Sequence, residues 1–216
     1  MRYAIDPTSK SGEVVSAEVW HRERQDELAQ CLACGGPVRR RPAHGVQTLH
    51  FFHLPGSNCP TIEPSGVRYD ALRSLPRDPK LAPANHAYFF RNLVGAHDRM
   101  KKVLGTIKLF DVVDMCKEAT KKDVWSLKGM TVELMPYVLM TCKDGFDAVG
   151  NRLYPVYYVL QAPPSGATYW NFPSTQVRHI LEVNANNPSD FTPRPMDLTP
   201  PINKSVEAIR QLLKQP

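Results

Sequence analysis

Residues that commonly bind metal ions are concentrated between Cys31 and Cys59. Cys31 and Cys34 form a C-x2-C pair, and two glycines follow directly. Such a pair lets one tight turn direct two thiolates at the same ion, and glycine permits that turn. Further along the chain, His50, His53 and Cys59 offer imidazole and thiolate ligands. Because structural zinc takes four such ligands in a tetrahedron, the spacing predicts a Cys3His zinc site.

Two histidines compete for the fourth position of this site. His50 and His53 are three residues apart, and residues three apart in an extended strand point to opposite faces, so only one of them can join the cysteines. We favour His53, because the residues Leu-Pro-Gly end the strand beside it and leave a short loop to Cys59. His50 is the alternative ligand, or a hydrogen-bonding neighbour of the ligands. Four protein ligands leave no position for water, so the predicted Zn2+ is structural.

The ligands need a hairpin that returns the chain to the C-x2-C pair. Residues 38–41 and 46–52 have the composition of two short strands, and alternation over residues 1–20 predicts a further β-hairpin, with a strand that continues to residue 19. The number of cysteines, five, is odd, and the first residues do not resemble a signal peptide, which argues against a disulfide framework. These features predict a zinc-ribbon-like β module over residues 1–65.

The sequence AIDPTSKSGEVVSAEVW precedes the C-x2-C pair, and HFFH at 50–53 and then Cys59 follow a basic hairpin. In this pattern, residues 4–65 resemble the N-terminal zinc-binding segment of CoiA-like competence proteins. The resemblance covers under a third of the chain. It implies a role in handling incoming DNA, in a bacterium or a mobile element. It also implies that a nuclease-like domain of the PD-(D/E)xK type follows the zinc segment.

The nuclease-like pattern is incomplete in this chain. Hydrolysis of a phosphodiester by such a domain requires carboxylates that hold a divalent metal ion. His97 and Lys101 match the family's His and Lys, but the acid before that His is absent. Asp147 and Gln161 match two further positions, whereas Val159 stands where a second acid is needed. We therefore expect no catalytic residues and no enzyme activity, and an active metal-dependent nuclease is the third interpretation of the function.

The rest of the chain predicts a second, α+β domain over residues 85–216, after a proline-containing linker at 66–84. Apolar residues at three- and four-residue spacing predict a long helix over 84–104 that Gly105 ends, and a short helix over 106–120. Turn dipeptides between apolar runs predict an antiparallel meander. Its expected strands are 131–141, 146–149, 153–161 and 176–183, followed by a proline-rich arm at 184–202 and an amphipathic terminal helix at 206–213.

The charge distribution is compatible with a phosphate-containing partner. The formal net charge is +6, and residues 91–128 hold nine Lys or Arg against five Asp or Glu. Strand alternation places Arg39 and Arg41 on one face of the zinc hairpin and Arg40 on the other. Cations on the long helix and after it provide a second basic surface, and a groove between the two surfaces would follow a phosphate backbone. The candidate nucleic-acid-binding residues are Arg39, Arg40, Arg41, Arg91, Arg99, Lys101, Lys102 and Lys108.

Two functions from different classes are compatible with these features. The first is a non-catalytic zinc-binding protein that binds nucleic acid, DNA foremost, or a nucleic-acid-processing complex. The alternative is a protein-interaction or inhibitory subunit that uses the second domain and the proline-rich arm, since proline-rich segments lose little entropy on ordering. No apolar run approaches the ~18 residues of a membrane helix, so we expect a cytoplasmic location without membrane contact. The sequence does not specify an oligomeric state.

Overall fold

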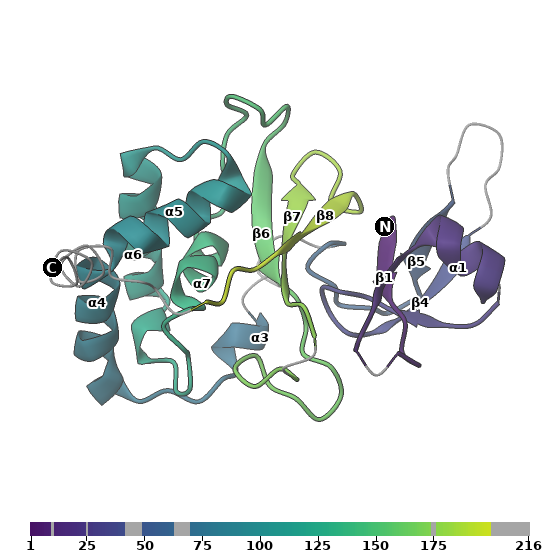
Figure 1. Ribbon diagram of the computed structural model, residues 1–216, viewed down its shortest axis with the longest axis horizontal. Helices are drawn as coiled ribbons and strands as arrows, with labels where there is room; N and C mark the ends of the chain where they lie inside the picture. The colour runs from purple at the N-terminus through teal and green to yellow at the C-terminus, as the bar shows by residue number, and fades with distance from the viewer. Residues whose placement is uncertain (10, 25, 42–48, 63–69, 174–175, 200–216) are drawn as a thin grey trace, which may run out of the picture. The chain divides into compact units, whose positions relative to one another are not determined.

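The computed structural model describes residues 1–9, 11–24, 26–41, 49–62, 70–173 and 176–199. The predicted terminal helix at 206–213 lies outside these residues. The described chain is mixed α+β and contains two antiparallel sheets, which confirms the predicted fold class (Figure 1). Within the described ranges, no helix combines the length and apolar character needed to cross a membrane.

The first sheet has the strand order β2-β1-β3-β4-β5, and neighbouring strands are antiparallel. Its two hairpins, β1 with β2 and β4 with β5, lie at the predicted positions in the sequence. The short β3 joins them, because it pairs with β1 on one side and with β4 on the other. The strands are β1 (Tyr3–Ile5), β2 (Val14–Ser16), β3 (Ala29–Gln30), β4 (Pro37–Arg41) and β5 (His50–His53).

A short helix, α1 (Ala17–Glu23), follows β2 directly. The prediction that this strand continues to Val19 is wrong, because the Ser16 side chain accepts a hydrogen bond from the backbone N–H of Val19 and caps a helix there. Trp20 then points into the core, where its ring meets Phe51 of β5 edge to face at 6.2 Å between centroids. The helix thereby covers the β4–β5 hairpin with one large aromatic side chain.

The second sheet consists of β6 (Val156–Leu160), β7 (His179–Asn184) and β8 (Phe191–Pro195) in that order. Alternate residues of β6 and β7 on one face are buried in the same apolar cluster as Trp20 and Phe51. These residues are Tyr157, Val159, Leu181 and Val183. The opposite face carries Tyr158, whose hydroxyl donates to Glu182 at 2.9 Å.

The proline-rich arm predicted at 184–202 is wrong for residues 191–195, which form β8. Pro193 and Pro195 face Leu181 and His179 of β7 in the register, and both prolines are tolerated because β8 is an edge strand. Phe191, 1% exposed, anchors the strand in the core. The burial of Phe191 therefore favours a strand here, although the proline-rich composition is typical of irregular structure.

Four helices follow the linker: α4 (Ala82–Arg91), α5 (Leu93–Leu104), α6 (Leu109–Lys121) and α7 (Met135–Cys142). The single helix predicted over 84–104 is divided at Asn92, whose side-chain amide donates to the Tyr88 carbonyl at 2.9 Å. Asn competes in this way for backbone groups that a continuous helix would use. Gly105 ends α5 with a φ of 72°, as predicted, and α6 confirms the second predicted helix.

The strand predicted at 131–141 is wrong, because residues 135–141 belong to the helix α7 and a turn precedes them. Every residue of α7 is buried, so its sequence shows no amphipathic period that would distinguish a helix from a strand. Pro136 stands at the start of the helix, where its fixed φ is favourable and its missing N–H costs nothing. The meander therefore consists of β6, β7 and β8, and Phe146 contributes only an isolated bridge to Val156.

The chain forms two compact units whose boundaries differ from those predicted. The first unit contains Met1–Ser74 together with Asp144–Met196, and the second contains Leu75–Lys143 together with residues 197–199. The physical reason is the shared core: the inner face of the second sheet completes the apolar cluster of the first sheet. The β4–β5 hairpin is thus part of a larger unit built from two distant stretches of sequence.

This division predicts that residues 1–74 do not fold fully when produced alone. Without β6, β7 and β8, the fragment leaves apolar side chains such as Val38 and Phe51 without part of their cover, and exposing them costs ~25 cal/mol per Å². We expect the fragment, supplied with one equivalent of zinc, to show lower amide chemical-shift dispersion and a less cooperative urea transition than the full chain. A fragment that unfolds with the cooperativity and midpoint of the full chain would contradict the division.

Candidate metal centre

The turn between β3 and β4 holds the first two cysteines. Gly35 N–H donates to the Cys31 carbonyl at 2.8 Å, and Cys31 N–H donates to the Gly36 carbonyl at 2.8 Å. Within this turn, the backbone N–H groups of Ala33 and Gly36 point at the sulfurs of Cys31 and Cys34, at 3.3 and 3.4 Å. Gly35 has a φ of 70°, which favours glycine. The backbone thus aims both sulfurs and stabilises negative charge on them.

The pairing of β4 with β5 decides between the two histidines. His53 lies opposite Val38, which is fully buried, whereas His50 lies opposite the exposed Arg41. The two histidines therefore lie on opposite faces of the hairpin, and only His53 lies on the face of the cysteines. Cys31, Cys34, His53 and Cys59 bring their ligand atoms within 4.8 Å of one another. The set predicted from the sequence is confirmed as a cluster that could hold a metal ion.

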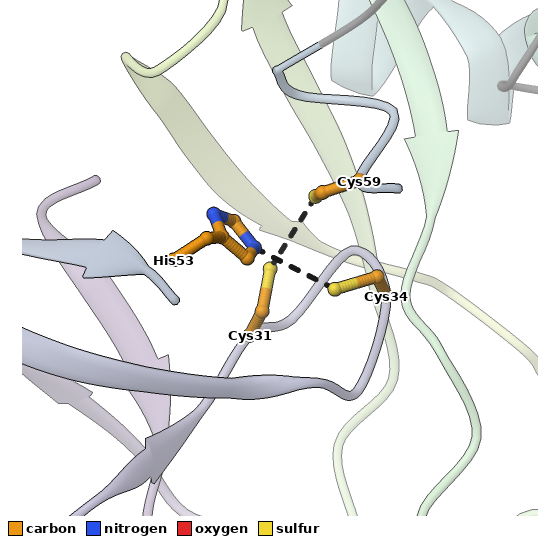
Figure 2. Close-up of side chains that lie close together, drawn as sticks. All are labelled: Cys31, Cys34, His53 and Cys59. Atoms are coloured by element: carbon orange, nitrogen blue, oxygen red, sulfur yellow. Dashed lines mark hydrogen bonds between the residues drawn. The ribbon is translucent and has the colours of Figure 1, made fainter. Parts of the chain in front are cut away.

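Two of the distances within the cluster match the edges of a tetrahedral zinc site. With Zn–S near 2.3 Å and Zn–N near 2.0–2.1 Å, a tetrahedron has S–S edges of about 3.8 Å and S–N edges of about 3.5–3.6 Å. The sulfurs of Cys31 and Cys59 are 3.8 Å apart, and the Cys34 sulfur lies 3.5 Å from His53 Nε2 (Figure 2). Three thiolates and an imidazole are soft ligands that suit zinc better than magnesium or calcium.

The second sheet holds both halves of the cluster in place. Tyr157 of β6 donates its hydroxyl to the carbonyl of Pro60, next to Cys59, at 3.0 Å. Ala162, just after β6, donates its N–H to the carbonyl of Leu32 within the C-x2-C turn at 2.8 Å. Thr61 adds a contact of 3.1 Å between its hydroxyl and the Cys59 sulfur. Nothing in the sequence marked these residues, because the contacts of β6 join segments that only the folded chain brings together.

The protonation of the cluster favours ligand chemistry. Hydrogen bonds from Cys31 and then Cys59 hold the pKa of the Cys34 thiol far below its usual value. Burial opposes the charge on His53, but hydrogen bonds to Cys34 and Cys59 raise its pKa to about 9. Hydrogen bonds to Cys34 and Cys59, together with burial, raise the pKa of the Cys31 thiol. Thiolate character is therefore concentrated on Cys34, and a bound metal ion would displace the remaining protons.

The residues that matched the nuclease pattern are divided between the two units. His97 and Lys101 belong to the second unit, whereas Asp147 and Gln161 belong to the first. Asp147 is exposed, and Gln161 is buried with its side-chain oxygen accepting from the N–H of His179 at 2.9 Å. Among the described residues, the Cys3His cluster is the group of potential ligands close enough to share a metal ion, and no carboxylate belongs to it.

The two cysteines outside the cluster differ in burial, since Cys142 is buried and Cys116 is half-buried, but both have raised pKa values. Burial raises the pKa of Cys116 to about 11 and that of Cys142 to about 12. Cys142 also donates to the Val138 carbonyl within its own helix, at 3.4 Å. A nucleophilic cysteine needs a lowered pKa, so these thiols fit packing roles.

The basic residues predicted to bind nucleic acid have different environments. Arg39 and Arg41 are exposed on one face of β4, while Arg40 is half-buried on the other, as the alternation predicts. The prediction that Arg99 binds nucleic acid is wrong. Its side chain is only 7% exposed and donates to the Thr199 carbonyl, because Arg99 lies on the buried face of α5. Lys102 forms an ion pair with Asp197 at 2.8 Å. Arg91, Lys101 and Lys108 are exposed at the surface of the second unit.

Comparison with known proteins does not assign the chain to a family. No protein-family model matches it, and no curated protein and no solved structure matches it either. The likeness to CoiA-like proteins therefore stays a prediction from the motif.

Replacing the cysteine pair tests the metal centre. The variant Cys31→Ser/Cys34→Ser removes two of four ligands, and we expect purified protein to fall from about one equivalent of zinc to under a tenth, measured by elemental analysis, with loss of cooperative unfolding. His53→Ala should also lose zinc.

The matched control is His50→Ala, which removes the other histidine of the same strand. It should keep one equivalent of zinc, because His50 lies on the opposite face of the hairpin. Equal zinc loss in His50→Ala and His53→Ala would show that the strand register assigned to the ligands is wrong.

Proposed function

We propose that the chain is a non-catalytic zinc-binding protein whose β4–β5 hairpin binds single-stranded nucleic acid, DNA foremost. The observation that carries this proposal is the composition of the outer face of the hairpin. The register places Arg39 opposite Phe52 and Arg41 opposite His50, so all four side chains lie on the face that points away from the metal ligand His53. Two guanidinium groups and an aromatic ring on one strand pair can bind phosphates and stack with a base.

Phe52 is oriented for a stacking role. Its strand neighbour Phe51 is 1% exposed and belongs to the core, whereas Phe52 is only half-buried. The Arg41 guanidinium lies over the Phe52 ring, 4.7 Å from its centroid. This cation–π contact keeps the arginine close to the ring and supports a surface where a base stacks while the flanking phosphate meets a guanidinium.

An open cavity of about 590 Å³ borders this surface on the first unit. Its lining includes His50 and Phe52 of β5 and the polar side chains Ser57 and Asn58 of the loop toward Cys59. The volume lies within the ~300–1,000 Å³ of small-molecule sites. A base extruded from a single strand would find both a stacking ring and hydrogen-bonding groups there, which supports single-stranded over duplex nucleic acid.

Zinc has a structural role in this proposal. Three thiolates and one imidazole fill a tetrahedron and leave no open position for a reacting water. The metal would fix the C-x2-C turn and β5 relative to one another, and so keep Arg39, Arg41 and Phe52 in register. We infer that the protein binds its ligand without converting it.

A second candidate function, a protein-interaction subunit, is favoured by a different surface. Leu109 and Phe110 at the start of α6 are 73% and 79% exposed. Large apolar side chains grouped on a surface mark interaction sites more often than isolated ones do.

Removing both exposed arginines of β4 tests the nucleic-acid surface. Each phosphate contact contributes ~0.7 to the slope of log K against log salt for single strands, so Arg39→Ala/Arg41→Ala should flatten the slope by about 1.4 and weaken binding to all sequences alike. Fluorescence anisotropy with a labelled single-stranded oligonucleotide at several salt concentrations measures both quantities.

The control for this variant is Arg22→Ala, which removes an exposed cation of α1 in the same unit. It should leave the slope unchanged. Unchanged affinity and slope in the Arg39/Arg41 variant, with zinc content intact, would remove the hairpin from the binding surface.

Removing the aromatic ring tests stacking separately from charge. Phe52→Ala should weaken binding by about 1–3 kcal/mol without changing the salt slope, because stacking on a ring releases no counterions. Phe110→Ala, which removes an exposed ring of the second unit, is the matched control and should bind normally. A Phe52→Ala variant that binds as tightly as the unchanged protein would exclude stacking at this position.

A further inference from the structure

The second unit carries an apolar groove of about 510 Å³ that the proposed nucleic-acid surface does not use. One wall consists of His86 and Phe90 of α4 with Leu93 at the start of α5. The other wall is α6, which contributes Leu109, Val113, Cys116 and Thr120. On the α6 wall these residues follow one another at four- and three-residue spacing and form one continuous stripe, whereas on the other wall His86 and Phe90 are one helical turn apart in α4 and Leu93 comes from the next helix.

The groove is exposed, and aromatic contacts hold its α4 wall in place. Phe90, Leu109 and Val113 are 45%, 73% and 40% exposed, although all three are large and apolar. The His86 ring packs against Phe90 at 4.6 Å and against Trp125 at 5.2 Å between centroids, which fixes the α4 wall. An apolar groove between helices is a surface that an amphipathic helix fits, because its own apolar side chains at helical spacing can pack between those of the walls.

The charges around the groove specify the chemistry of the occupant. Lys117 and Lys121 line it, and no Asp or Glu does among the described residues. Lys121 already pairs with Glu118 at 2.6 Å, whereas Lys117 is exposed and has no ion pair within the described chain. Two other carboxylates of α6, Asp111 and Asp114, pair with Lys143 instead. The groove is therefore apolar with a cationic margin, and an acidic side chain beside it would gain an ion pair.

Two other occupants carry the wrong charge. A second copy of this groove would bring the same lysines against Lys117 and Lys121. The chain's own terminal segment, residues 200–216, holds three Lys or Arg and one Glu. Like charges facing one another are unfavourable, so charge complementarity favours a partner that is acidic.

We propose that this groove binds an acidic amphipathic helix of another protein. Apolar side chains spaced at i, i+3 or i+4, and i+7 enter between α4 and α6, and a carboxylate on the flank of that helix pairs with Lys117. The site lies in the second unit and does not depend on the metal centre or on the nucleic-acid surface.

Selection from a display library tests this inference while the partner protein is unidentified. The library holds helical peptides with a fixed Leu/Ile/Phe stripe at helical spacing and random residues elsewhere, and the full-length zinc-loaded chain is the target. We expect the enriched peptides to carry more Asp and Glu than the starting library. Their affinity, measured by fluorescence anisotropy, should fall at least tenfold with Val113→Asp and at least fivefold with Leu109→Ser.

Lys117→Glu reverses the charge at the margin and provides a second readout. It should lower the affinity for the acidic peptides at least fivefold and raise the affinity for versions of these peptides in which Lys replaces the acidic residues. Leu153→Ser, which removes an 86% exposed apolar side chain of the first unit, is the control and should change nothing. Circular dichroism confirms that each variant is folded.

Three results would overturn the proposal. The first is enrichment of no peptide whose binding depends on Val113 or Leu109, and the second is enrichment of basic peptides. The third is evidence that this chain fills the groove itself. Either a chain ending at residue 199 binds the peptides at least tenfold more tightly than the full chain, or the protein forms a dimer that Val113→Asp dissociates.

Discussion

The central interaction of the first unit is the approach of four potential ligand atoms to within 4.8 Å of one another. Cys31 and Cys34 come from a turn between β3 and β4, His53 ends β5, and Cys59 lies in the loop beyond. These segments are short, and two- to five-residue strands have little stability of their own. A metal ion that binds only the folded arrangement adds its binding free energy to folding, which is how small zinc modules compensate for a limited core.

The cluster and the second sheet support one another. Tyr157 and Ala162 donate hydrogen bonds to the backbone next to Cys59 and within the C-x2-C turn. Tyr157 also packs in the apolar cluster with Trp20 and Phe51. The outer face of the β4–β5 hairpin does not form part of this apolar cluster, and it carries Arg39, Arg41 and Phe52. A rigid inner face with an outer face of cations and one ring is an arrangement in which binding needs little reordering, and low reordering cost favours affinity.

The Cys3His cluster could be predicted from sequence because its information is local. The C-x2-C pair, the histidine at the end of a strand and the strand alternation each follow from spacing within about thirty residues. The division into units could not be predicted, because it depends on which sheet completes the core of another, and β6, β7 and β8 lie far beyond the ligands in the sequence. Local competition explains further errors: Ser16 caps a helix where alternation predicted a strand, and uniform burial of α7 hides its helical period. Arg99 lies on the buried face of α5, and the carbonyl that accepts from its guanidinium, that of Thr199, is distant in sequence and could not be predicted.

X-ray absorption at the zinc edge tests the central claim most directly, because it reports the identity and distance of the atoms around the metal. On protein purified without added metal, we expect a zinc edge whose nearest atoms fit three sulfurs at about 2.3 Å and one nitrogen at about 2.0 Å. A zinc environment dominated by oxygen or nitrogen, or one with fewer than three sulfurs, would contradict a Cys3His centre built from Cys31, Cys34, His53 and Cys59.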